Sequence, residues 1–144
     1  MHQWVTQYLS MVFRKDCYDF EVWQRYQYFR DTHQIYHLIR NGKCWLFAFF
    51  GGVYQLTGDG IYSTKSAFKR EQMTLDVDKE LWKVNGDKGW KEMCAIVMQH
   101  MIDVFHGSDA PLGTLSRYSF SIFAMNGKLK TFCKNICKVL GILK

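Results

Sequence analysis

Three acidic side chains, Asp76, Asp78 and Glu80, lie two residues apart and have the chemistry of general bases. Apolar residues alternate with them from Met73 to Leu81, which predicts a strand with one buried face and one acidic face. A carboxylate on such a face becomes a useful base if burial raises its pKa toward neutrality. Solvation is the simpler explanation for three acids on one face, so both interpretations stay open.

A turn with two glycines runs from Asn85 to Gly89 and precedes the clearest helix in the sequence. The helix is predicted over Trp90–Phe105, because apolar residues recur there at i, i+3, i+4 and i+7. The first N–H groups of a helix lack backbone partners and lie at the positive end of its dipole, so they can hold a phosphate. The turn is therefore a candidate cofactor site.

Two pairs of metal-ligand residues have helical spacing. His33 and His37 are four residues apart, as are Cys133 and Cys137, and together they could form a tetrahedral zinc site. Strong zinc signatures bring closer cysteine pairs, and both cysteines also fit the apolar face of a helix. We therefore expect no metal.

Composition and charge limit the possible classes of protein. The 144 residues suit a single domain, and 48% apolar with 22% charged residues excludes a disordered or fibrous chain. The net charge of +6 indicates an anionic partner, although it also serves solubility. The five cysteines are an odd number and no signal peptide is recognisable, which favours a reducing cytoplasm. The longest apolar run, Cys44 to Phe50, is too short for a membrane span.

Taken in order, the chain predicts helices and strands around that central turn. One or two short helices are expected within the aromatic-rich stretch from Met1 to Arg40, where mixed rings and basic residues could also stack on nucleic-acid bases. The predicted strands cover Lys43–Phe50, Val53–Leu56, Met73–Leu81 and Tyr118–Ala124. The predicted core comprises Trp45, Phe47, Phe49, Leu75, Val77, Met93, Val97, Met101, Phe120, Ile122, Phe132 and Ile136.

A final amphipathic helix follows the Asn126-Gly127 turn and ends at Gly141. Its apolar stripe includes Leu129, Phe132, Cys133, Ile136 and Leu140. The opposite stripe is Lys130, Lys134 and Lys138, which we expect to face solvent. Basic amphipathic helices bind membranes, phosphates or acidic partners, but a solvated outer face explains the same spacing.

This order of elements resembles the GNAT N-acyltransferase family over residues 42–142. The resemblance rests on the Met73–Leu81 strand, the Asn85–Gly89 turn with its helix, and the closing run from Tyr118 to Ile142. It is especially similar to small GNAT-like proteins encoded by tailed phages, including an internal virion protein of short-tailed phages. A phage origin would place the protein in the host cytoplasm or in the virion.

The resemblance implies an α/β (α+β) domain with a mostly antiparallel twisted sheet that binds acetyl-CoA. The implied cofactor contacts are Asn85, Gly86, Lys88, Gly89 and Asn126, and the candidate bases are Asp76, Asp78 and Glu80. Two departures from the family's pattern indicate lost catalysis. The last glycine of the turn lies one residue late, and no tyrosine lies between Gly127 and Gly141.

Two functions follow as hypotheses. The first is an acyl-CoA-dependent N-acyltransferase or its catalytically degenerate descendant. The second is a non-enzymatic phage or host interaction protein, which binds nucleic acid or an acidic protein through its basic and aromatic surface.

Overall fold

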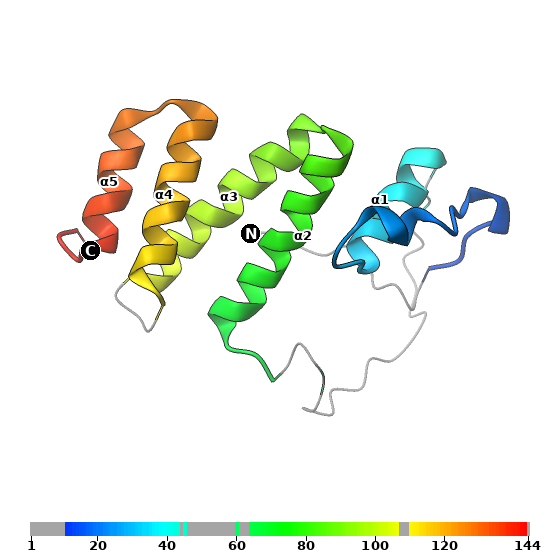
Figure 1. Cartoon of the computed structure of the whole chain (residues 1–144), viewed down its shortest axis with the longest axis horizontal. Helices are drawn as coiled ribbons and strands as arrows, with labels where there is room; N and C mark the ends of the chain where they lie inside the picture. Colours follow the sequence, from blue (N-terminus) through cyan, green and yellow to red (C-terminus); the bar gives the residue numbers. More distant parts are fainter. Residues whose placement is uncertain (1–10, 44, 46–59, 61–63, 107–109, 144) are drawn as a thin grey trace. The chain divides into compact units, whose positions relative to one another are not determined.

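The computed structural model describes residues 11–43, 45, 60, 64–106 and 110–143 (Figure 1). The chain divides into two compact units, an N-terminal unit (Met1–Thr64) and a C-terminal unit (Lys65–Lys144), which are described separately. That the whole chain forms a single domain stays a prediction. The helical elements are η2 (Lys15–Cys17), η3 (Val22–Arg25), α1 (Asp31–Asn41), α2 (Ala67–Asn85), α3 (Lys88–Phe105), α4 (Leu112–Asn126) and α5 (Leu129–Val139).

The predicted α/β fold is wrong, because every regular element in the described ranges is a helix and none is a strand. The Met73–Leu81 segment lies within α2 and the Tyr118–Ala124 segment within α4. The GNAT fold depends on a sheet, so the predicted GNAT resemblance is wrong. The phage origin was inferred from that resemblance and is withdrawn with it. The other two predicted strands lie outside the described residues, apart from Lys43 and Trp45.

In α2, the residues that pack on the core are seven positions apart, which is helical spacing. The alternation of apolar and acidic residues from Met73 to Leu81 hid this spacing in the sequence. Leu75 is fully buried, and the partly buried Phe68 and Trp82 pack against the same core. Residues at i and i+7 lie on one side of a helix, two turns apart. The helix begins at Ser66, whose hydroxyl accepts a hydrogen bond from the Lys69 amide at 3.3 Å.

The sequence of α4 also fits both the two-residue period of a strand and the 3.6-residue period of a helix. Leu115, Tyr118, Ser119 and Ile122 are buried at i, i+3, i+4 and i+7, which is helical spacing. The buried Ser119 hydroxyl donates to the Leu115 carbonyl at 3.1 Å, so its polar group is satisfied within the helix. Phe120 was predicted in the core on a strand period, but it is 63% exposed.

Two of the three Asn-Gly pairs, Asn85-Gly86 and Asn126-Gly127, end helices with a left-handed glycine instead of turning strands. The third, Asn41-Gly42, ends α1 with Gly42 in an extended conformation. Gly86 after α2 and Gly127 after α4 have φ values of 66° and 67°, the left-handed conformation of a helix C-cap. Short links then lead into α3 and α5, so the C-terminal unit consists of two consecutive helical hairpins (Figure 1). The predicted helix over Trp90–Phe105 is confirmed as α3, which begins two residues earlier.

The apolar core of this unit forms between α2, α3 and α4, and Val139 of α5 also belongs to it. The largest share comes from α3: Cys94, Val97, Met98, Met101 and Ile102. Five predicted core residues are buried: Leu75, Val77, Val97, Met101 and Ile122. Met93, Phe132 and Ile136 are half-buried and Trp45 is exposed, whereas Phe47 and Phe49 lie outside the described residues.

The N-terminal unit contains α1, as predicted for its aromatic-rich stretch. Tyr26 packs on this helix, with its hydroxyl 2.6 Å from His37 Nε2 and its ring 4.1 Å from the His33 ring. His33 Nδ1 accepts a hydrogen bond from the Arg30 amide at the start of α1. The two histidines are therefore structural contacts of α1.

The helix ends give the first prediction. Gly127→Ala should lower the free energy of unfolding by about 1–2 kcal/mol, because alanine is strained at positive φ. No heavy atom lies within 4 Å of a Cβ at this position, so the loss would measure backbone conformation alone. Urea unfolding followed by circular dichroism measures it.

Gly113→Ala is the matched control, because this glycine lies within α4, lacks positive φ and also has open space around its Cβ. The control should be neutral or more stable by up to about 1 kcal/mol. If both variants lost equal stability, the left-handed cap after α4 would be contradicted.

Candidate functional site

The three predicted bases all lie on α2, but the helix does not bring them together. Asp76 is exposed, Glu80 is half-buried and Asp78 is only 1% exposed. Successive helical residues are rotated by about 100°, so Asp76 and Glu80 share one side while Asp78 lies about 200° from Asp76. The predicted acidic face is thus divided, and a catalytic role for these residues stays a prediction.

Asp78 is a buried carboxyl group with an unusual pKa. Neither of its oxygens has a hydrogen-bond partner among the described residues, and burial raises its pKa from 3.8 to about 7. The Cys94 thiol on α3 is buried as well. Its pKa rises to about 12, chiefly through burial and secondly through the negative charge of Asp78. A charged Asp78 therefore destabilises its own surroundings, and protonation relieves that cost.

The predicted cofactor turn lies at the α2–α3 link, where its polar groups serve the helix ends. Asn85 Nδ2 donates to the Leu81 carbonyl at 2.9 Å, and Asp87 accepts a hydrogen bond from the Gly89 amide at 2.8 Å. Asp87 thus caps α3 with its own carboxylate, at the place where a phosphate would bind. Lys88 is the exposed first residue of α3.

Asn126 lies at the other link, as the last residue of α4. Its Oδ1 accepts a hydrogen bond from the Lys128 amide at 3.3 Å. It was grouped with the Asn85–Gly89 turn only through the family resemblance, and the two stretches belong to different hairpin links. Their role in binding a cofactor stays a prediction.

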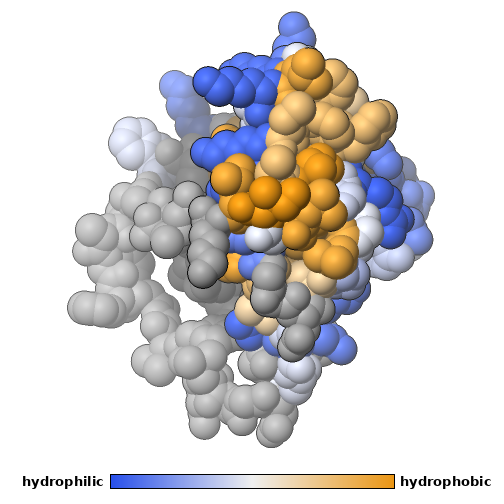
Figure 2. Space-filling view, turned by 90° about the vertical axis from the view of Figure 1, so that its left-hand side faces the viewer, coloured by the Kyte–Doolittle hydropathy of each residue, from blue (hydrophilic) through white to orange (hydrophobic). Residues whose placement is uncertain are grey.

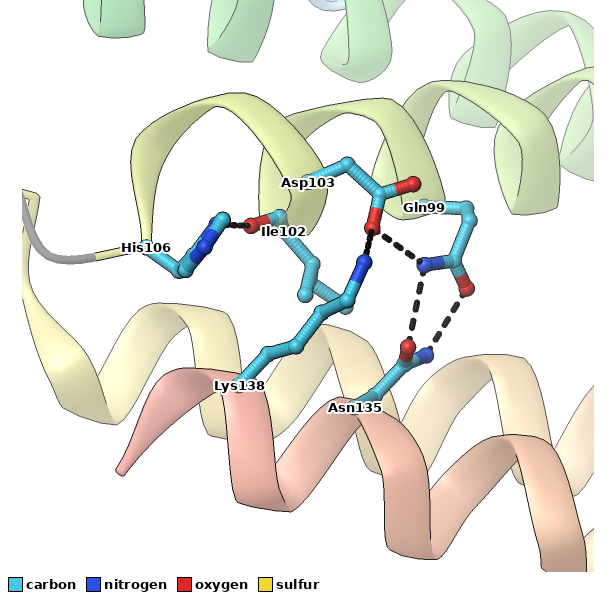
Figure 3. Close-up of polar contacts among 6 residues, drawn as sticks. All are labelled: Gln99, Ile102, Asp103, His106, Asn135 and Lys138. Carbon is cyan, nitrogen blue, oxygen red and sulfur yellow. Dashed lines mark hydrogen bonds and ion pairs between the residues drawn. The ribbon is translucent and has the colours of Figure 1, made fainter. Parts of the chain in front are cut away.

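α5 packs on α4 and α3, with Val139 in the apolar core, and polar contacts join it to α3. Asn135 is 1% exposed and exchanges two hydrogen bonds with Gln99 of α3, at 2.8 and 2.9 Å (Figure 3). One turn farther along, Lys138 Nζ lies 2.6 Å from Asp103 Oδ1, which also accepts a hydrogen bond from Gln99 at 3.2 Å. These contacts fix which side of α5 faces the rest of the unit.

The opposite side of α5 carries an exposed hydrophobic area. Leu129, Leu140 and Ile142 are each more than half exposed, and Cys133 lies between the two leucines. Figure 2 shows a continuous hydrophobic area on the side of the molecule that carries α5, with hydrophilic residues around it. We define the α5 surface as Leu129, Lys130, Cys133, Lys134, Leu140, Ile142 and Leu143.

Gly141 shapes the end of this surface, as predicted from its position. With φ at 73°, it lets the Ile142 amide donate to the Cys137 carbonyl at 2.8 Å, while its own amide donates to Lys138 at 2.9 Å. These two bonds form the Schellman motif that folds a chain back over its last helical turn. The exposed Ile142 and Leu143 are thereby placed next to α5.

The stretch of sequence that carries the α5 surface has charge of one sign, although Asp103 of α3 pairs with its Lys138. From Ala110 to Lys144 the sequence contains six basic residues and no acidic one. Lys130 and Lys134 are exposed as predicted, but the predicted stripe fails at Lys138. The Lys138 side chain is 17% exposed, because it turns toward Asp103 on α3.

The candidate zinc ligands are divided between the two units. Burial and then the neighbouring His37 lower the pKa of His33 to about 4, and burial also lowers that of His37. Cys133 and Cys137 lie on α5, exposed and half-buried respectively. In the described ranges, no three histidine, cysteine or acidic side chains are grouped for a metal ion.

The sequence analysis missed Gln99, Asp103 and Asn135. A signal was present, because Asn135 lies three residues after Phe132 and four before Val139, within the inward side of the final helix. A polar side chain at such a position needs a buried partner, and an amide on a neighbouring helix is one.

The second prediction concerns Asp78. The folded chain binds its proton up to about pH 7, whereas an unfolded chain releases it near 3.8. The stabilisation is therefore complete below about pH 4 and lost as the pH rises through 7. Asp78→Asn should match the wild type near pH 4 and exceed its stability by about 2–4 kcal/mol above pH 7.5. Urea unfolding across this range measures the difference.

Asp76→Asn is the control, because Asp76 is exposed on the same helix. It controls for the loss of one carboxylate from the exposed side of α2. A difference between Asp78→Asn and the wild type that stayed constant from pH 4 to 8 would show that the carboxyl group is solvated.

Comparisons with known proteins return no relative for this chain. No family model, no curated protein and no solved structure matches it. In the part of the chain that the structure describes, no helix has the length and apolar character needed to cross a bilayer.

Proposed function

We propose that the C-terminal unit is a non-enzymatic helical binding module, which takes an acidic protein partner through the α5 surface. The observation that carries this proposal is an exposed aliphatic area bordered by lysines, within a stretch that contains no acidic residue. Exposed apolar areas of this kind mark binding sites in proteins. The lysines define the charge of the partner.

The electrostatics favour a carboxylate-rich ligand. Lys138 already has Asp103 as its partner, whereas Lys130 and Lys134 are exposed on the same helix. Like charges four residues apart on a helix repel one another by a few tenths of a kcal/mol. A bound acidic partner would replace that repulsion with attraction, in proportion to how far the site excludes water and salt.

The chemistry of the exposed side chains favours protein over nucleic acid. Nucleic-acid surfaces stack bases on aromatic rings and use arginine to contact phosphate in a bidentate manner. The α5 surface offers leucine, isoleucine and lysine instead. The aromatic ring of α5, Phe132, is half-buried with its centroid 5.3 Å from that of Phe123 on α4.

The thiols suit a reducing compartment, and we include the cytoplasm in the proposal. Cys17, Cys94, Cys133 and Cys137 are all free thiols, and Cys133 is exposed within the proposed binding surface. An exposed thiol persists best where disulfides are reduced. Acetyl-CoA binding was expected through a resemblance that the fold overturns, so we do not propose it.

The third prediction tests the charge of the partner. Wild-type protein should bind fluorescent polyglutamate with an affinity that falls as salt rises, measured by anisotropy. Replacing Lys130 and Lys134 together by glutamine should weaken binding by at least about fivefold, because two charge contacts are lost. Lys138 stays unchanged in this variant, so that its contact with Asp103 continues to hold α5.

The matched control replaces Lys65 and Lys83, which are exposed elsewhere in the unit, by glutamine. It has the same net charge as the test variant and should bind polyglutamate like the wild type. Equal losses in the two variants would show that only net charge matters. Tighter binding to duplex DNA than to polyglutamate at the same salt would overturn the choice of partner.

A further inference from the structure

In the described part of the C-terminal unit, α5 has one exposed side. Each helix from α2 to α5 packs against the next one along the chain, and α3 also packs against α5. Lys79 of α2 reaches α4, where its ammonium lies 5.4 Å from the centre of the Tyr118 ring. α5 is the last helix, and its exposed leucines lie on the side away from Asn135 and Val139.

The apolar residues along the exposed side of α5 have the spacing of a helix–helix seam. Leu129, Cys133, the half-buried Ile136 and Leu140 follow one another at intervals of four, three and four residues. The same alternation occurs along the seam of a two-helix coiled coil, in which each apolar side chain enters a hole between four side chains of a partner helix. A seam of this kind receives a helix more readily than an extended peptide.

The two borders of the seam differ in charge and in exposure. Lys130 and Lys134 lie along one border and are exposed, whereas Phe132 on the other border is half-buried against α4. A helix that packs along α5 would therefore meet lysines on one of its edges only. Carboxylates along that edge would pair with the lysines and fix the register of the partner.

A second copy of this chain fits the seam poorly. A symmetric α5–α5 pair would use the same surface on both copies and bring their lysines near one another. The sequence from Ala110 onwards offers no carboxylate to offset that repulsion. The charge therefore disfavours a symmetric pairing of α5 with α5, and we choose a partner of different sequence.

We infer that the partner contributes an amphipathic helix, with one acidic edge, that packs along the Leu129–Leu140 seam as the next helix of the array. This inference rests on the proposed function and adds the conformation of the partner to it. Binding by this route needs both the apolar seam and the lysines, whereas a purely electrostatic contact needs the lysines alone.

The test compares two peptides of identical composition with the full-length protein. One has leucine at the seam positions of about three heptads and glutamate beside them, and the other has the same residues in scrambled order. Isothermal calorimetry should show at least about tenfold tighter binding of the heptad peptide. Circular dichroism should show that this peptide gains helix on binding.

Variants of the seam sharpen the comparison. Leu129→Gln combined with Leu140→Gln changes side chains that are 61% and 63% exposed, so folding should be retained. The double variant should lose at least about tenfold in affinity for the heptad peptide and none for the scrambled one. Leu112→Gln is the matched control, because Leu112 is 56% exposed and begins α4 just as Leu129 begins α5.

The remaining outcomes are distinct. Equal binding of both peptides, with loss on the lysine replacements, would overturn the helix inference and leave the proposed function standing. If neither peptide nor polyglutamate bound, both would be overturned. Tighter binding to vesicles of anionic phospholipid than to the heptad peptide would overturn the inference in favour of a membrane surface. Self-association that the leucine replacements abolish would overturn the inference in favour of a second copy of this chain.

Discussion

The buried amide pair between Gln99 and Asn135 determines the orientation of α5. Two hydrogen bonds of 2.8 and 2.9 Å between matched amides require one rotation of the helix about its axis and one register along α3. An unpaired amide at a site that is 1% exposed would cost about 1–3 kcal/mol, so other rotations are disfavoured. Lys138 and Asp103 reinforce the same register one turn away. The exposure of the α5 surface follows from this contact.

The sequence pattern predicted the helices that are rich in apolar residues. It failed to predict the helices whose inward side carries polar or small residues. α3 and α5 were both found, with boundaries within two residues of those observed. α4 has the small Ser119 on its inward side and an exposed Phe120 beside it, so a period of two fits its sequence as well as a period of 3.6. The Asn-Gly pairs after α2 and α4 did not resolve the choice, because hairpin turns and left-handed helix C-caps both favour glycine at positive φ.

The candidate site was predicted in its parts but not in its arrangement. The lysines, the C-cap at Gly141 and the apolar stripe of the final helix were all recognised from spacing. The rotation of that helix was not, because a helical wheel places the largest apolar residues inward by default. A contact between residues 36 positions apart, Gln99 and Asn135, opposes that assignment, and periodicity within one helix contains no information about it.

The hydrophobic effect and the polar contacts favour different orientations of α5. Hydrophobic burial alone would turn Leu129 and Leu140 toward α3 and α4, since each fully buried leucine gains about 1.5–3 kcal/mol over an exposed one. That rotation would carry Asn135 into solvent and separate Lys138 from Asp103. The structure adopts the orientation that keeps the polar contacts, with both leucines more than 60% exposed. Folding of the C-terminal unit therefore leaves the apolar stripe of α5 uncovered, and a partner helix would complete its burial without disturbing the contacts that hold α5 in place.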